Sequence, residues 1–387
     1  MNTNMLATQP AREAPQRVAD ACFHGGAFFK TIGEEFTHLD RRRQVINADV
    51  LDAWFPPAPS VIAALRDHLP WLLQTSPPTQ CQGLVRVISR ARDVPASCVL
   101  PGAGSSDLMF LALRAWLTPR SRVLMLDPTY GEYAYVCERV IGCTVDRMTL
   151  DRRDRYSVDL DVLEAMLQTE YDLVILVNPN NPTGQHIPRV ALEAVLRRMP
   201  STSRCWVDEA YVDYCGLDES LERFAVSRSN VVVCKSMSKV YALSGMRAAY
   251  LIANADIVRE LRGLTPPWAV SLPAQVAAVH ALRASDYYAA CYFKTHELRE
   301  YLAQGLRTIC PSSEVVGGAG NWLLWYPPSA GPSPAEIARR CRTHGLFIRE
   351  FDGPHRETGG DVLRLAVKDL DTQKRMLGIL EWALGGK

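Results

Sequence analysis

Short, continuous runs of apolar residues recur through the middle of the chain. They are Val123–Leu126, Leu173–Val177, Cys205–Val207, Val231–Cys234 and Ala248–Ile252. These runs are too short and too uniformly apolar for amphipathic helices, so they predict strands buried on both faces of a mainly parallel sheet. Stretches with helical spacing, such as 108–117 and 190–199, lie between them. This alternation predicts an α/β architecture.

The pattern changes from Pro266 onward. Helical spacing covers 274–282, 287–306 and 334–344, and short apolar runs occur at 322–325 and 363–367. A chain of 387 residues is longer than one hydrophobic core usually serves. We therefore predict a large domain over 46–269 and a smaller α+β domain over 270–387. The segment 1–45 is expected to pack on the small domain or over the active site.

Charge and cysteine usage exclude several classes of protein. The 43 basic residues nearly balance the 42 acidic ones, so no overall field would recruit nucleic acid or an anionic membrane. The eleven cysteines form no CxxC pair and no Cys/His ligand spacing, which indicates reduced thiols and no metal site. The N-terminus has no apolar signal region, and no run of eighteen apolar residues occurs. We expect a soluble, cytoplasmic protein.

Polar residues follow the predicted strands directly. Asp127, Asn178, Asp208 and Lys235 each come at or just after the end of an apolar run. In an open parallel sheet, ligands bind outside the carboxyl ends of the strands. The sequence therefore predicts a site along one sheet edge.

The segment Gly102-Ala-Gly-Ser-Ser-Asp107 precedes a predicted helix. Small residues there let backbone N–H groups approach an anion such as a phosphate. The alternative is an ordinary helix N-cap made by Ser105 or Ser106. A dinucleotide-binding turn is disfavoured, because the third glycine is missing and no acidic residue ends a strand about twenty residues later.

Asp208 and two lysines suggest chemistry at this edge. A carboxylate at the mouth of a buried strand needs a cationic partner, which a protonated pyridine nitrogen would supply, and Tyr211 could reach the same ligand. Lys235 and Lys239 are equal candidates for a reactive amine on this reasoning alone.

Four motifs together resemble a known family. Asn-Asn-Pro-Thr-Gly at 180–184, Asp208-x-x-Tyr211, Ser236-x-Ser-Lys239 and Arg247 have the order and spacing of the class I/II aminotransferases of pyridoxal-5′-phosphate (PLP) fold type I. The histidinol-phosphate aminotransferase and threonine-phosphate decarboxylase branch is the most similar. The resemblance covers residues 46–387 and implies an aspartate-aminotransferase fold and a homodimer.

The resemblance also implies a role for each matching residue. Lys239 forms the internal aldimine and moves the proton at the substrate Cα, while Asp208 pairs with the pyridine nitrogen. Arg364 binds the substrate α-carboxylate. The other cofactor contacts are Asn181 and Tyr211 on the ring 3-oxygen, Tyr130 on the ring face, and the backbone of Ser105 and Ser106 with the side chains of Ser236, Ser238 and Arg247 on the phosphate.

Three segments depart from the family pattern: 49–57, 75–78, and Lys368-Asp369 after the Arg364 strand. Histidinol phosphate itself is therefore not the expected substrate. Asn47, Asp49 and Asp52 become candidates for the substrate side, with Trp54 and Phe55 beside them, and a basic amino acid such as arginine would suit an acidic pocket. The alternative is that the aspartates cap a helix and the aromatic residues belong to the core.

We predict an aminotransferase that acts on an L-amino acid through aldimine and quinonoid intermediates. The alternative is a PLP-dependent lyase or cyclase that decarboxylates, or eliminates a γ-substituent from, an arginine-like amino acid in a specialised pathway. A transcription regulator is disfavoured because the first 45 residues are too few for a winged helix. A nicotinamide dehydrogenase is disfavoured by the incomplete glycine motif.

Overall fold

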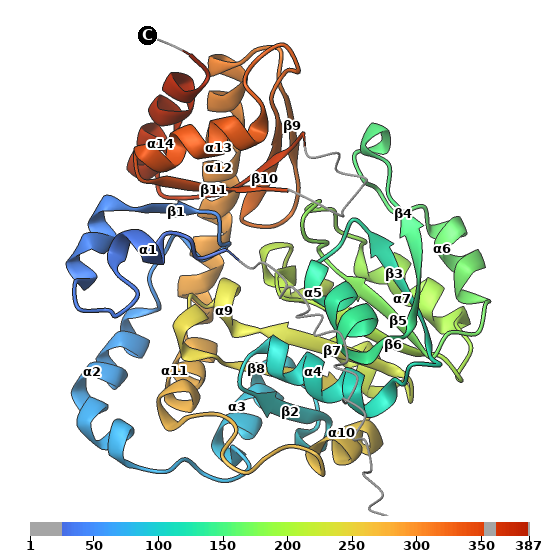
Figure 1. The fold of residues 1–387 in the computed structure, drawn as a ribbon. Helices are drawn as coiled ribbons and strands as arrows, with labels where there is room; N and C mark the ends of the chain where they lie inside the picture. The colour runs from blue at the N-terminus through green and yellow to red at the C-terminus, as the bar shows by residue number, and fades with distance from the viewer. Residues whose placement is uncertain (1–24, 352–360, 386–387) are drawn as a thin grey trace, which may run out of the picture.

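The computed structural model of the chain describes residues 25–351 and 361–385. Most of the expected N-terminal segment, residues 1–24, lies outside the described residues. Helices and strands form two layered bodies, one around a larger sheet and one around a smaller sheet (Figure 1). The long helix α12 (Ser285–Ile309) extends along both bodies in this view.

The larger sheet has seven strands in the order β2-β8-β7-β6-β5-β3-β4. Their bounds are β2 Val99–Gly102, β3 Arg122–Asp127, β4 Thr144–Thr149, β5 Leu173–Val177, β6 Arg204–Asp208, β7 Val231–Ser236 and β8 Ala249–Ala253. Four of the five apolar runs lie within one of these strands, and the fifth, 248–252, overlaps β8 with a shift of one residue, so the predicted strands are confirmed. β8 runs antiparallel to β7 and β2, and the other strands are parallel to each other. The sheet is therefore mostly parallel, as predicted.

Alternate residues of the central strands enter two separate cores. One face packs on α4 (Ser105–Trp116) and α10 (Ala255–Arg262). The other face packs on α6 (Leu160–Leu167), α7 (Arg189–Arg198) and α8 (Glu222–Val226). On β5, for example, Ile175 belongs to the first core and Val174 to the second, so apolar residues are required at consecutive positions.

Further helices complete the larger body. These are α2 Pro59–Gln74, α3 Gln82–Arg92, α5 Gly131–Ala134 with a π-helical continuation Tyr135–Ile141, α9 Met237–Val240 and α11 Leu272–Leu282. The short helix α1 (Phe29–Ile32) lies beside the smaller body, where the preceding Phe28 packs on Phe347 (Figure 1). α11 packs against α2 and α3 (Figure 1). The predicted helices at 108–117, 190–199, 274–282 and 287–306 match α4, α7, α11 and α12 to within a few residues.

The smaller sheet is mixed and has the order β1-β11-β12-β10-β9. Its strands are β1 Ile46–Ala48, β9 Glu314–Gly317, β10 Trp322–Tyr326, β11 Leu346–Glu350 and β12 Leu363–Ala366, and its other helices are α13 Pro334–Thr343 and α14 Leu370–Ala383. β1 pairs in parallel with β11, so a segment from the start of the chain joins a sheet built from its end. The domain boundaries stay a prediction.

The strand directions bring distant residues to one edge. β3, β5, β6 and β7 are parallel and end at the same side of the sheet. β8 runs the opposite way, so Arg247, which precedes it, also arrives at this edge. The smaller sheet adds Arg364 from β12, whose Nη1 donates to Asn181 in the loop after β5.

Candidate active site

Lys239 lies on α9, directly after β7, and its side chain is partly exposed. Its Nζ lies 2.9 Å from Oδ1 of Asp52. Lys235 has different surroundings, because its Nζ lies 3.0 Å from Oδ1 of Asp213 and 3.5 Å from Oε2 of Glu209 within the protein. Lys235 is thus part of an internal ion-pair network, and Lys239 is the lysine that faces the sheet edge.

Asp52 is surrounded by donors. Its Oδ1 also accepts a hydrogen bond of 2.7 Å from the Ser244 hydroxyl, and its Oδ2 one of 3.5 Å from Asn47 Nδ2. Lys368 Nζ donates to its backbone carbonyl at 3.4 Å. Burial would raise the pKa of Asp52, but the nearby Lys239 and Ser244 outweigh burial and hold this pKa below its usual value. Burial lowers the pKa of Lys368 to about 8.

Asp208 is buried at the end of β6, and each of its carboxylate oxygens accepts a hydrogen bond. The backbone N–H of Ala210 donates to Oδ1 at 3.0 Å, and the Tyr133 hydroxyl donates to Oδ2 at 2.7 Å. Tyr133 in turn accepts a bond of 2.8 Å from Trp206 Nε1. Burial raises the pKa of Asp208, and the donors from Tyr133 and Ala210 oppose that shift.

Two further tyrosines of the motifs lie near Asp208. The ring of Tyr130 lies edge-on to that of Tyr133, at 5.9 Å between centroids. Tyr211 is buried, and its ring packs at 4.6 Å from that of Trp322. Burial raises the pKa of Tyr211, while the positive charge of Arg364 acts in the opposite direction.

Arg364 is buried and faces the loop after β5. Its Nη1 donates to Asn181 Oδ1 at 2.6 Å and its Nη2 to the carbonyl of Asp49 at 3.1 Å. Its Nε is buried without a hydrogen-bond partner among residues 25–351 and 361–385. Burial lowers the pKa of Arg364 to about 10, and neighbouring Arg349 adds to this effect. The carboxylate of Asp49 pairs with Arg349 at 2.7 Å.

The start of α4 meets Arg247. Gly104 precedes the helix with a φ of 102°, and a Cβ atom added there would overlap with Nη2 of Arg247. Arg247 Nη1 also donates to Ser238 Oγ at 3.4 Å, and Ser236 Oγ accepts from the N–H of Ser238 at 3.3 Å. Unpaired N–H groups of a helix start and a guanidinium form a cradle suited to an anion.

The candidates from the sequence thus gather in three neighbouring groups along one edge. Ser105, Ser106, Ser236, Ser238 and Arg247 form the anion cradle; Lys239 lies with Asn47 and Asp52; Arg364, Asn181 and Asp49 form the third group, with Tyr130, Tyr211 and Asp208 nearby.

Two alternatives left open by the sequence are resolved by the structure. Neither Asp49 nor Asp52 caps α2, the helix that follows them, since its N-cap is Ala58. The aromatic residues belong to the interior, because Phe55 is buried against Tyr288 and Trp54 Nε1 donates to Thr295. The N-cap of α4 is Gly104, so neither Ser105 nor Ser106 caps that helix.

Four contributors were not assigned roles from the sequence: Tyr133, Ser244, Arg349 and Lys368. Tyr133 lies in the segment that follows Asp127 at the end of an apolar run, and Lys368 lies in one of the segments that depart from the family pattern. Their positions were therefore visible as part of a polar segment after a strand and as a departure. Their partners, which lie 75 residues away for Tyr133 and 316 for Lys368, were not.

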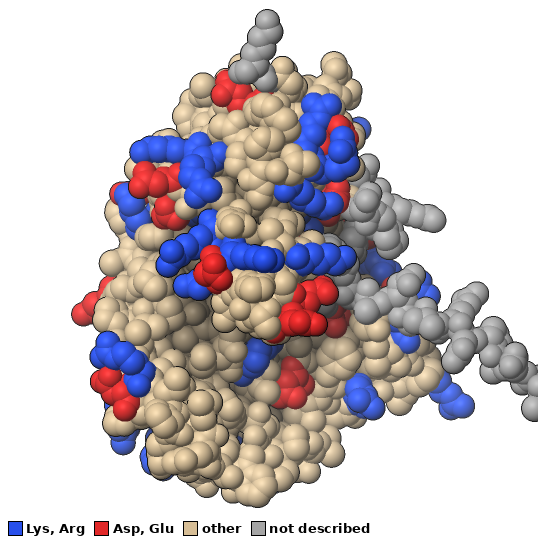
Figure 2. Space-filling model, turned by 60° about the vertical axis from the view of Figure 1, so that its left-hand side comes forward, with Lys and Arg blue, Asp and Glu red and all other residues tan. Residues whose placement is uncertain are grey.

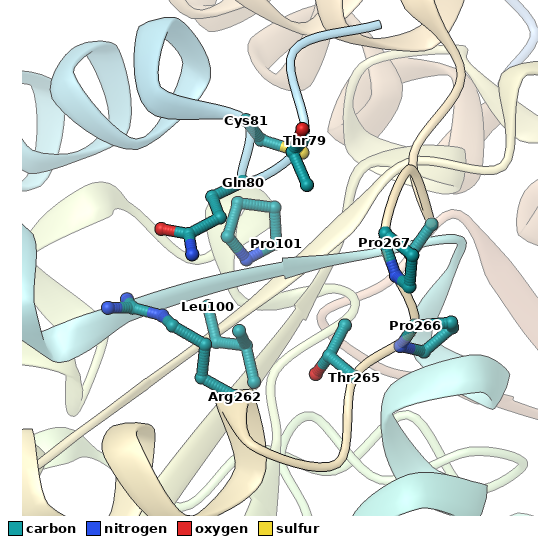
Figure 3. Close-up of a pocket in the computed structure, with 10 residues that line it drawn as sticks. Thr79, Gln80, Cys81, Leu100, Pro101, Arg262, Thr265, Pro266 and Pro267 are labelled. Carbon is teal, nitrogen blue, oxygen red and sulfur yellow. The ribbon is translucent and has the colours of Figure 1, made fainter.

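A pocket lies away from this edge. It has a volume of about 220 Å³ and is lined by residues from the 79–81 loop, from β2 and from the 262–269 segment. Figure 3 shows Leu100 and Pro101 between the loops that carry Thr79 and Thr265. β2 is an edge strand, and no lining residue belongs to the groups described above.

Charges of both signs are interspersed on the face shown in Figure 2, as the near-zero net charge leads one to expect. Within the described ranges, no helix is long and apolar enough to cross a membrane. The same part of the chain contains no cluster of three or more His, Cys, Asp or Glu side chains that could hold a metal ion.

Curated relatives share about three tenths of the sequence. The chain is 31% identical, over 308 residues, to a histidinol-phosphate aminotransferase of Staphylococcus saprophyticus. The matched region covers 79% of this chain and 84% of that one. A histidinol-phosphate aminotransferase of Moorella thermoacetica is 28% identical, with 76% and 75% covered.

Solved structures share the fold at lower identity. Histidinol-phosphate aminotransferase from Sinorhizobium meliloti, in complex with pyridoxal-5′-phosphate, superposes with a TM-score of 0.79 at 21% identity and covers 87% of this chain and 90% of that one. L-threonine-O-3-phosphate decarboxylase from Porphyromonas gingivalis gives a TM-score of 0.76 at 19% identity, with 88% and 100% covered.

A family model, aminotransferase class I and II, matches residues 84–377. This span includes α4, every strand of the larger sheet, and Lys239, Asp208 and Arg364. The solved structures show that the chain has the aspartate-aminotransferase fold. Because the family model matches more than half of the chain, the chain belongs to the class I and II aminotransferase family.

Proposed function

We propose that this protein is a PLP-dependent aminotransferase that acts on an L-amino acid and binds its cofactor covalently through Lys239. The observation that carries the proposal is the arrangement at one sheet edge. The amine of Lys239, the buried carboxylate of Asp208 and the guanidinium of Arg247 all come to this edge, and their chemistry supports one shared cofactor site. The names of the curated relatives support the same activity.

The residues present fit PLP. Asp208 is a buried carboxylate whose two hydrogen bonds come from neutral donors, so a protonated ring nitrogen would supply the cation it lacks. The cradle of Arg247 and the α4 N-terminus suits the cofactor phosphate. Tyr211 and Asn181 would hold the ring oxygen, and Tyr130 would cover the ring face. When bound, PLP supplies an electron sink for the bond broken at the substrate Cα.

This chain's own side chains would do the rest. Within the described residues, Nε of Arg364 is buried without a hydrogen-bond partner, and the guanidinium offers a planar pair of donors to an α-carboxylate. The amine of Lys239 would move the proton at the substrate Cα. Asn47 and Asp49 would line the substrate side. We propose a substrate with an α-carboxylate on the basis of Arg364.

The test is a half-reaction with the PLP-loaded protein and a panel of L-amino acids and histidinol phosphate. We expect at least one L-amino acid to convert the bound cofactor to its amine form, which absorbs at shorter wavelength, and 2-oxoglutarate to reverse the change. Lys239→Ala should reduce the rate by at least about a thousandfold, because covalent and proton-transfer roles are lost together. Release of CO₂ or a cyclised product without the amine form would instead favour the lyase or cyclase.

A further inference from the structure

Two lysines, Lys239 and Lys368, contact Asp52. Its carboxylate pairs with Lys239 at 2.9 Å, and its backbone carbonyl accepts from Lys368 at 3.4 Å. The two lysines come from different bodies of the fold, on α9 and after β12. Asp52 belongs to the 49–57 segment, which departs from the family pattern, and is not one of the motif residues.

The position of Asp52 is fixed from several sides. Ser244 and Asn47 bond its two carboxylate oxygens, and Asn321 Nδ2 donates to the neighbouring carbonyl of Leu51 at 3.1 Å. The side chain of Asp52 is 37% exposed. The side chain of Asp49 is only 6% exposed and forms an ion pair with Arg349. A carboxylate held this way is oriented toward the Lys239 amine.

We propose that Asp52 is a positioning residue that holds the Lys239 amine whenever this amine is not bonded to the cofactor. The inference rests on the proposed function of Lys239. An amine held against a carboxylate is not free to attack a carbonyl carbon, so the pair must open before the cofactor is captured. Asp52 therefore slows capture, and in exchange it keeps the freed lysine at the site during turnover.

The opposite signs of these two effects provide the test. In Asp52→Asn, we expect the apo-protein to bind PLP about five times faster, the factor expected when a partly exposed ion pair of about 1 kcal/mol is lost. Turnover should fall in the same variant, because the freed amine is no longer held. In the apo-protein, Lys239 should also be acylated faster by an amine-reactive ester, as read by peptide mass spectrometry.

Matched variants control for charge and folding. Asp67→Asn removes an exposed ion pair of α2 with the same change in net charge and should leave capture unchanged. Ser244→Ala keeps the carboxylate but removes its 2.7 Å hydrogen bond, and should change capture and acylation in the same direction by a smaller factor. Ser244→Ala thus serves if Asp52→Asn fails to fold by circular dichroism.

The outcomes separate this inference from the proposed function. If the wild-type protein captures no PLP, the proposed function fails first. If the wild type captures PLP, and Asp52→Asn and Ser244→Ala bind it and are acylated at the wild-type rate, the inference about Asp52 is wrong and the proposed function stands. A change confined to KM for one class of amino acid would also overturn it, since Asp52 would then be a substrate contact.

Discussion

Tyr133 forms the middle of a directed hydrogen-bond chain behind Asp208. The indole N–H of Trp206 can only donate, so the Tyr133 oxygen accepts from it and the Tyr133 hydrogen points to Asp208 Oδ2. A donor to the ionised carboxylate opposes the effect of burial on the pKa of Asp208. Tyr133 therefore favours the charged form that a protonated ring nitrogen requires.

Tyr133→Phe tests this role. Loss of the donor should raise the pKa of Asp208 further, so its protonated form persists to higher pH and the acid limb of kcat/KM should shift upward. PLP affinity should fall about tenfold, which corresponds to one charge-assisted hydrogen bond. Tyr156→Phe is the matched control, because it removes a buried hydroxyl that bonds Tyr326 in a different core. An unchanged acid limb in Tyr133→Phe would rule the role out.

At the residue scale, the sequence predicts which residues reach the site edge better than it predicts which side chains they contact. The motifs place Lys239, Asp208 and Arg364 at one edge, as the structure does. Spacing alone leaves Lys235 and Lys239 equal, because what separates them is the contact of Lys235 with Asp213 and Glu209 inside the fold. The partner of Lys239 lies 187 residues away in the chain, and no local pattern encodes a contact of that range.

At the element scale, apolar runs predict strands and a mainly parallel sheet, but not which strand runs antiparallel. All five runs became strands, since a strand buried on both faces needs apolar residues at consecutive positions. The antiparallel direction of β8 and the pairing of Ile46–Ala48 with β11 were not predictable, because both are set by the path of the connecting chain. The direction of β8 is what carries Arg247 to the site edge.

The junction between β2 and α4 depends on a glycine. Gly104→Ala should displace Arg247, because the added methyl group overlaps with its guanidinium, and PLP affinity should drop about tenfold, as for one lost contact to phosphate. Gly216→Ala is the matched control, since Gly216 also has a positive φ of 123° but open space around its Cβ position. Equal PLP affinity in the two variants, measured by equilibrium dialysis, would contradict the cradle.

At the scale of the whole molecule, the site lies between two bodies of the fold. The larger sheet and its helices carry Lys239, Asp208 and Arg247, and strand β12 of the smaller sheet carries Arg364. A homodimer stays a prediction of the family resemblance. Large apolar side chains such as Trp71, Leu73 and Trp268 are exposed on the larger body, and a partner subunit is one way to cover them.

The central claim is that Lys239 binds the cofactor. The most direct measurement is to load the protein with PLP, reduce the cofactor–lysine bond with borohydride, and map the modified peptide by mass spectrometry. We predict a single phosphopyridoxyl group on Lys239, with Lys235 and Lys368 unmodified, and none on the Lys239→Ala protein. Modification of Lys235 or Lys368 in place of Lys239, or no reducible bond at all, would contradict the account.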